Sequence, residues 1–305
     1  LTKFLRRPCL DAVLFLLFWT AISTAPIIPF IVIYPLTNVE PKSISSQKAV
    51  VCDSKIVTES FGSMSSSSNE LRNSNVDAFS PISTPNKSQA WIDLNVTKLN
   101  KIIREIFINH GLNKNHASIS TNALINAELV GAYGHGLARL KMYCDRIKKK
   151  LINPKPNIKI KNISQSISLI DANNSIGFVA ADIAIKKAIK NANKTGIGLI
   201  AVKNSGHYGL SGYYAEQAVK KNLITMIYTN APPAVAPHGS LKSLFGTNPI
   251  CFGTPTGSKI PFILDTSISM INRGKIRVAA RNNQKIPDGV ALDKFGKPTT
   301  DAKKA

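Results

Sequence analysis

The chain has 305 residues, of which 44% are hydrophobic and 18% are charged. This composition suits one large folded domain or two ordinary ones and excludes a chain that is disordered throughout. Lys and Arg number 39 against 17 Asp and Glu, a net charge of +22. We interpret the excess as scattered, solvated side chains that attract anionic ligands, because no basic stripe alternates with aromatic residues. We therefore predict no nucleic-acid partner.

Residues 1–40 differ from the rest of the chain. Arg6 and Arg7 precede an apolar stretch over residues 12–34, which is the order found in a signal anchor or a signal peptide. Two prolines interrupt the stretch, and the chain begins with Leu rather than Met, so an artefact of the assigned start is a third interpretation. We predict a cytoplasmic protein, with membrane anchoring through residues 12–34 as the alternative.

Residues 41–90 are rich in Ser, Asn and Pro. Such a segment buries too little apolar surface to offset the entropy of ordering, so we predict a disordered linker. From residue 91 the pattern becomes that of a folded domain, which we assign to residues 91–305.

Within this domain, helical patterns come first and strand patterns follow. Apolar spacing and stop residues predict helices over residues 99–110, 116–130, 137–149, 178–192 and 211–221. Short apolar or alternating runs predict strands over residues 158–161, 166–170, 197–202, 223–228, 250–253 and 262–264. This order indicates an α/β or α+β domain with a mixed sheet.

Several familiar site motifs are missing from the sequence. The four cysteines have no CxxC spacing, and the histidines outside the glycine-rich turns have no acidic partners at metal-ligand spacing, so we predict no metal site. GxGxxG does not occur after a strand pattern, which indicates a fold other than the Rossmann fold.

His207 is the first candidate for chemistry. It lies in the loop Asn204–Gly209, directly after a buried-strand pattern and before a helix. Imidazole titrates near neutral pH, which suits general acid–base catalysis. The structural alternative is a turn histidine bonded only to the backbone.

His135 and Arg139 form a second candidate. His135 lies between two glycines, and Arg139 follows four residues later. If a helix begins at Leu137, the two side chains face one ligand, and the planar guanidinium matches a carboxylate. A glycine-flanked helix break with a surface arginine is the structural alternative.

Polar residues also flank three predicted strands: Thr229–Asn230 follows one, Thr247–Asn248 precedes another, and residues 265–267 end a third. Their amide and hydroxyl groups suit a ligand and suit an ordinary turn equally well. Together with the two histidines they favour a small-molecule site.

A series of ordered blocks gives these motifs a common context. The blocks are GHGLARLKMYCDRI, INPKP, DANNSIGF, GIGLIAVKNSGHYG, TNAPPAVAPHG, LFGTNP, PFILDTS, RGKI and IPDGVALDKFGKPTTDA. From about Trp91 to Ala305 their order and spacing resemble the malate/L-lactate dehydrogenase family of NAD(P)-dependent oxidoreductases. This non-Rossmann group also contains ureidoglycolate, sulfolactate and diketogulonate enzymes.

The resemblance implies both a fold and a reaction. The implied fold has an N-terminal helical part and a cofactor domain built on a mixed, largely antiparallel sheet. The implied reaction transfers a hydride between NAD or NADP and a small anionic 2-hydroxy acid of the malate, lactate, sulfolactate or ureidoglycolate type. The family also implies a homodimer.

The resemblance also implies roles for particular residues. His207 matches the residue that donates or accepts the proton, His135 grips the substrate or shares that role, and Arg139 binds the substrate carboxylate. Asn230 and Ala231 match a segment that contacts the cofactor. A second such segment comprises Pro261, Phe262, Ile263, Leu264, Asp265, Thr266 and Ser267.

Three positions depart from the family pattern. Gly134 replaces the usual serine of a Ser-His-Gly motif, Ala231 replaces a common serine, and His238 replaces a frequent tryptophan. The family domain continues beyond Ala305, so we expect a C-terminally truncated domain. The alternative to an active dehydrogenase is a catalytically inactive, truncated remnant of one.

Overall fold

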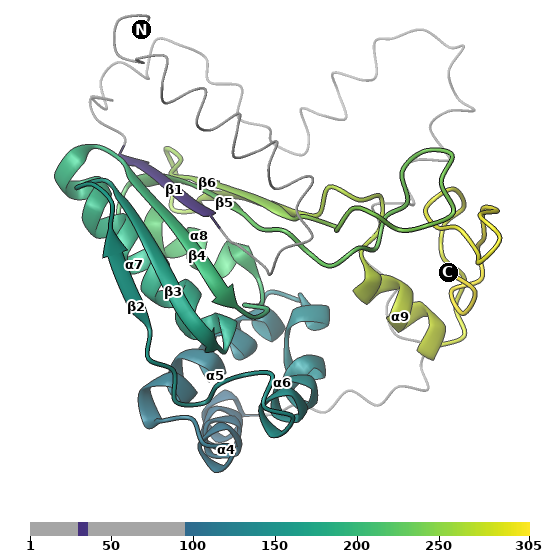
Figure 1. Cartoon of the computed structure of the whole chain (residues 1–305), viewed down its shortest axis with the longest axis horizontal. Helices are drawn as coiled ribbons and strands as arrows, with labels where there is room; N and C mark the ends of the chain where they lie inside the picture. Colours follow the sequence, from purple (N-terminus) through teal and green to yellow (C-terminus); the bar gives the residue numbers. More distant parts are fainter. Residues whose placement is uncertain (1–29, 36–94) are drawn as a thin grey trace, which may run out of the picture. The chain divides into compact units, whose positions relative to one another are not determined.

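The computed structural model describes residues 30–35 and 95–305 (Figure 1). Within them, seven strands form one sheet in the order β2-β3-β4-β1-β5-β6-β7. The strands, in chain order, are β1 Phe30–Pro35, β2 Lys159–Asn162, β3 Ile167–Ser175, β4 Gly198–Ser205, β5 Leu223–Tyr228, β6 Ile250–Thr254 and β7 Phe262–Thr266. Only β3 and β4 pair in parallel, and the other neighbours are antiparallel, which confirms the mixed, largely antiparallel sheet.

The described residues also form helices along most of the chain from residue 96 onwards. The helices, with two 3-10 turns labelled η, are α4 Val96–Asn109, α5 Lys114–Leu129, η1 Tyr133–His135, η2 Leu137–Arg139, α6 Leu140–Lys148, α7 Gly177–Thr195, α8 Ser211–Val219 and α9 Arg273–Arg281. Figure 1 shows α4, α5 and α6 grouped at one end of the strands, which confirms the predicted N-terminal helical part. None of the helices in the described ranges is long and apolar enough to cross a membrane.

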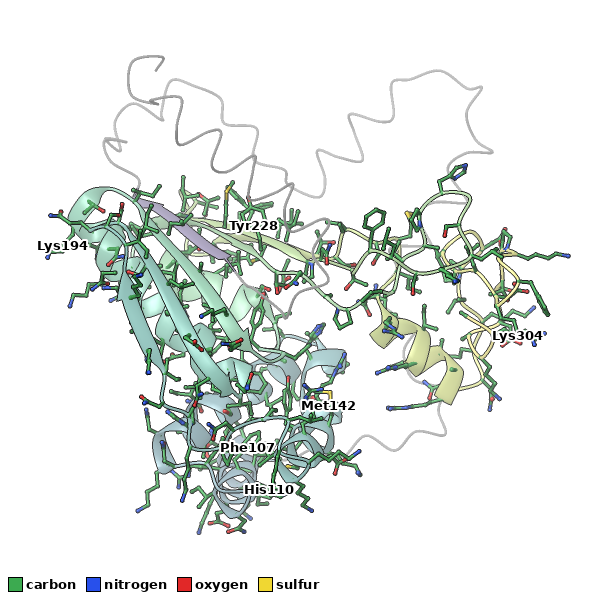
Figure 2. The ribbon with its side chains drawn as sticks, viewed as in Figure 1. Phe107, His110, Met142, Lys194, Tyr228 and Lys304 are labelled. Atoms are coloured by element: carbon green, nitrogen blue, oxygen red, sulfur yellow. The ribbon has the colours of Figure 1, made fainter. Side chains whose placement is uncertain are left out.

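Two hydrophobic clusters hold this arrangement together. One packs α7 and α8 against β3, β4 and β5, with Ile170, Ile200 and Ile227 buried. The other joins α4, α5 and α6 to the start of α7 and includes Phe107, which is fully buried (Figure 2). Phe178 opens α7 in this second cluster, so α7 links the helical part to the sheet.

The sequence of α7 explains why it can lie between both clusters. Five alanines allow close approach to the sheet and favour the helix, and Gly196 ends it with a left-handed φ of 80°. Just before α7, β3 shifts register between Asp171 and Ser175. Asn173 and Asn174 have positive φ in this bulge, and it sets the point from which α7 starts.

Most predicted elements are present, with three differences. The predicted helix 137–149 is divided into the 3-10 turn η2 and the helix α6. Helix α9 was not predicted. Residues 30–35, inside the predicted anchor or signal segment, form β1, which pairs with β4 on one side and β5 on the other. Residues 12–29 and 41–90 lie outside the described residues, so the anchor and the linker stay predictions.

Candidate active site

A cavity of about 440 Å³ lies where the helical part meets the ends of β4 and β5. Its volume is in the range of small-molecule sites. Its lining comes from η1, η2, α6, the His207 loop, the segments around Asn230 and Thr247, and α9. His135, Arg139, His207, Asn230 and Ala231 all line it, so five of the predicted site residues come together.

His207 is fixed at one ring nitrogen. The Tyr143 hydroxyl lies 2.6 Å from His207 Nδ1, and the Gly209 backbone N–H donates to the same nitrogen at 3.2 Å. Tyr143 is fully buried, and its ring packs on Phe178 with centroids 4.8 Å apart. The histidine is therefore bonded to a buried side chain as well as to the backbone.

Close backbone packing places the loop that carries His207. A Cβ on Gly177 would collide with the carbonyl oxygens of Gly206 and His207. Gly209 has φ 84°, and a Cβ there would lie 2.7 Å from the Phe178 ring. The bulge before α7 and these two glycines together allow the loop to rest on the first turn of the helix.

His135 lies against His207, with ring centroids 5.7 Å apart and planes inclined by 16°. Its turn is held from α5, because the Leu137 backbone N–H donates to Glu128 Oε1 at 2.6 Å. A Cβ on Gly136 would collide with the Glu128 side chain, which would then have to move. A buried glycine and one carboxylate thus fix the orientation of the His135 turn.

Arg139 is partly buried and braced by its own loop. Its Nε donates to the Gly134 carbonyl at 2.7 Å. Nη1 also lies 3.9 Å from the sulfur of Met142, which lines the cavity on α6 (Figure 2). Bracing through Nε leaves the terminal nitrogens as the donors for a ligand carboxylate.

Burial and positive neighbours keep both imidazoles neutral. Burial, followed by the Arg139, His135 and Arg146 charges, lowers the pKa of His207 to about 3. Burial and Arg139 lower the pKa of His135 to about 4. Desolvation and nearby cations both disfavour an imidazolium.

Three further arginines line the cavity, Arg146 on α6 and Arg273 and Arg277 on α9. None of the described lining residues is acidic. Within the described part of the chain, no ion pair joins these arginines or Arg139 to a carboxylate. The cavity is therefore strongly positive and suits an anionic ligand.

The strand ends supply neutral polar groups. Thr229, Asn230 and Thr247 line the cavity, and the first two are buried. The Ala231 backbone N–H donates to Asn248 Oδ1 at 2.9 Å, which ties the end of β5 to the start of β6. These amides and hydroxyls are the donor set that a carboxamide-bearing ring needs.

The predicted segment 261–267 lies elsewhere. It forms β7 and its flanks at the edge of the sheet, and none of its residues lines the cavity. Asp265 Oδ2 accepts the Gly212 N–H at 2.8 Å, so it caps the N-terminus of α8. Phe262 and Leu264 are exposed on one face of the strand. In the described ranges, no group of His, Cys, Asp or Glu is arranged to hold a metal.

Sequence reasoning missed five residues that shape the site: Glu128, Tyr143, Arg146, Gly177 and Arg277. Tyr143 and Arg146 fall within the predicted helix 137–149 and were not singled out. Their spacing from Arg139, four and seven residues, was the one available signal, because it places all three on one helix face.

Chemically, the cavity offers a neutral imidazole pair, a guanidinium held for a carboxylate and polar strand ends. Such a set can exchange a proton with an oxygen next to a carboxylate. The sequence profile of the malate/L-lactate dehydrogenase family matches residues 94–305.

Individual relatives agree with that match. L-sulfolactate dehydrogenase of Methanocaldococcus jannaschii is 40% identical over 205 residues, which cover 67% of this chain and 59% of the relative. An NADP(+)-linked (2R)-3-sulfolactate dehydrogenase of Chromohalobacter salexigens is 35% identical, over 63% of this chain and 57% of the relative. An NAD(+)-linked ureidoglycolate dehydrogenase of Escherichia coli O157:H7 is 31% identical, over 67% and 58%. The chain thus spans less than two thirds of the length of these relatives.

Solved structures share the fold. Malate dehydrogenase from Entamoeba histolytica aligns with a TM-score of 0.67 and 31% identity, over 70% of this chain and 59% of that one. Sulfolactate dehydrogenase from M. jannaschii aligns with a TM-score of 0.65 and 39% identity, over 70% and 62%. By its sequence profile, its relatives and its fold, this chain belongs to the malate/L-lactate dehydrogenase family.

Proposed function

We propose that this protein is an oxidoreductase that transfers a hydride between NAD or NADP and a small 2-hydroxy acid or its 2-oxo form. One observation carries the proposal: the stacked His135 and His207 lie beside Arg139 in one cavity that has no acidic lining among the described residues. When Arg139 holds the substrate carboxylate, the hydroxyl or oxo oxygen on the next carbon lies near His135 and His207.

Each residue has a defined task in this proposal. Arg139 holds the substrate carboxylate, and His135 helps to orient the substrate. His207 exchanges the proton with the hydroxyl or oxo oxygen, and its neutral ring can do so near neutral pH. The nicotinamide, when bound, donates or accepts the hydride.

The cavity fits part of a dinucleotide. A volume of about 440 Å³ holds a small acid and a nicotinamide ring, so the remainder of the cofactor extends outside it. Thr229, Asn230 and the Ala231 region would hold the nicotinamide end. Contact between the cofactor and residues 261–267 stays a prediction. Relatives use NAD(+) in one case and NADP(+) in another, so we propose NAD or NADP without a choice between them.

The lining favours substrates that carry a second negative charge. Arg139 can hold one carboxylate, and Arg146, Arg273 and Arg277 remain to meet another anionic group. We therefore propose a preference for acids of the malate or sulfolactate type over lactate.

We also propose a homodimer. Support comes from β7, an edge strand on which Phe262 and Leu264 are 51% and 46% exposed. Exposed apolar groups on a strand edge are typical of surfaces that another chain covers. The cytoplasmic location stays a prediction.

The proposal is tested by following nicotinamide absorbance with the purified 305-residue chain. We expect oxidation of NADH or NADPH with oxaloacetate, and a slower reaction with pyruvate. No absorbance change with any member of a panel of 2-oxo and 2-hydroxy acids would contradict the activity. Failure to bind either cofactor as well would favour the inactive remnant.

A further inference from the structure

We propose that Tyr143 and the Gly209 backbone N–H hold neutral His207 in the tautomer with its proton on Nε2, and that Tyr143 replaces this proton when it is delivered. The inference rests on the proposed function only for the delivery step. The tautomer itself is a property of the protein without any ligand.

The geometry at Nδ1 determines the tautomer. A backbone N–H can only donate, so the 3.2 Å bond from Gly209 requires a lone pair on His207 Nδ1. The Tyr143 hydroxyl, 2.6 Å from the same nitrogen, must then donate as well. With Nδ1 accepting from both groups, the proton of a neutral ring is on Nε2.

This tautomer decides what His207 offers to a ligand. Because Nδ1 is occupied, Nε2 is the ring nitrogen left for a ligand in the cavity that His207 lines. It presents an N–H donor. The resting protein is therefore prepared to donate to the oxo oxygen of a 2-oxo acid, whereas a base for a hydroxyl proton would need a bare Nε2.

The groups around His207 disfavour a second proton on its imidazole ring. His135, Arg139 and Arg146 face His207 from η1, η2 and α6, and with burial they hold its pKa far below neutrality. Tyr143, also on α6, is the uncharged group in contact with Nδ1. A delivered proton must consequently be replaced through Nδ1 rather than taken from an imidazolium.

Reduction of the oxo carbon needs a hydride, which a bound nicotinamide would supply. In this step the His207 Nε2–H bond breaks and an O–H bond forms on the substrate. The Tyr143 O–H bond breaks, and its proton moves to Nδ1, which leaves a phenolate. Arg139 and Arg146 favour that phenolate, since both lower the pKa of Tyr143 against the larger effect of burial. One proton from bulk solvent then reaches Nε2, and Nδ1 returns its own proton to Tyr143, so that the reaction consumes one solvent proton.

Ring ¹⁵N NMR tests the tautomer directly. The chain has five histidines, and a His207→Asn variant identifies the His207 signals. In the ligand-free protein at pH 7, we expect a protonated Nε2 and an unprotonated Nδ1. In Tyr143→Phe, we expect the Nδ1–H form to gain population. A protonated Nδ1 in the wild type, or an imidazolium, would overturn the proposal even if the protein proved inactive.

Kinetics of Tyr143→Phe test the delivery step. The ring and its packing on Phe178 are kept, so we expect kcat for 2-oxo acid reduction to fall roughly 100-fold while KM changes little. Tyr214→Phe is the matched control, because Tyr214 is equally buried and its hydroxyl donates to the Tyr208 carbonyl at 3.0 Å. Equal turnover in both variants would overturn the relay. If Tyr143→Phe does not fold, the wild-type NMR result decides.

Discussion

Two walls of one cavity differ in how they are held. The wall that carries His207 and His135 rests on two hydrophobic clusters, buried glycine contacts and the hydrogen bonds that Tyr143 and Glu128 form with it. The opposite wall is α9, and its cluster contains three buried residues, Ala279, Ile286 and Ala302. Figure 1 shows α9 set apart from the other helices.

The two walls therefore have different functions in the proposed reaction. Groups that exchange a proton must be held in position before the substrate arrives, and the first wall does this. Exposed arginines on α9 act through charge, which is screened by salt and tolerates movement. We expect changes to the first wall to affect turnover or folding strongly, and changes to α9 to affect substrate choice mildly.

After His207, the largest effect on catalysis is expected at Arg139. In Arg139→Met, the partly buried cation that we propose holds the substrate carboxylate is lost, at a cost of about 2–5 kcal/mol. We expect kcat/KM to fall roughly 30- to 5,000-fold. Arg104→Met, on the exposed face of α4, is the control. A loss below about threefold would mean that Arg139 does not bind the carboxylate.

Gly177→Ala tests the packing that places the His207 loop. The added Cβ collides with two backbone carbonyls that cannot rotate away, so we expect the free energy of unfolding to fall by about 2–3 kcal/mol. Gly257→Ala is the control, because nothing lies within 4 Å of a Cβ there. Denaturant titration measures both. Equal midpoints would show that the loop is not held by this contact.

Acid should lower the stability of the folded protein through the two buried histidines of the first wall. His207 and His135 have pKa values near 3 and 4 in the folded protein and about 6.5 when unfolded, so the unfolded chain binds more protons between these values. Stability is therefore lost as the pH falls from 6.5 towards 4, by at most about 1.4 kcal/mol per pH unit for each proton.

Denaturant midpoints measured across this pH window give the slope. His207→Asn should flatten it, whereas His238→Asn, at an exposed position, should leave it unchanged. An unchanged slope in His207→Asn would contradict a neutral, buried imidazole.

The smallest effect is expected at Arg277. In Arg277→Gln, we expect the KM for a malate-type acid to rise about fivefold and the KM for lactate to stay constant, because one exposed charge contributes about 1 kcal/mol. Added salt should reduce the difference. Lys275→Gln, on the same helix but outside the cavity lining, is the control. A similar change in KM for both acids would contradict the proposal that Arg277 meets a second anionic group of the substrate.

The sequence predicted the first wall better than the second. Strong apolar periodicity gave α4, α5, α7, β4 and β5, and the candidates His207, His135 and Arg139 all line the cavity. Helix α9 was missed because its sequence, RGKIRVAAR, has few apolar residues and buries only Ala279.

The contacts that orient the site could not be predicted from local patterns. Tyr143 and His207 are 64 residues apart, and their pairing depends on how α6 meets the end of β4. The role of Gly177 depends on a bulge in β3, and that of Glu128 on a turn nine residues later. Asp265, in the segment expected to contact the cofactor, is bonded to α8, a contact that the strand pattern does not encode, and the cofactor contact itself stays a prediction.

Turnover of His207→Asn tests the central claim most directly. With NADH or NADPH and oxaloacetate at pH 7, we expect kcat to fall roughly 100- to 10,000-fold relative to the wild type, with little change in KM. His238→Asn should retain wild-type turnover. Wild-type turnover in His207→Asn would contradict the assignment of His207 as the residue that exchanges the proton.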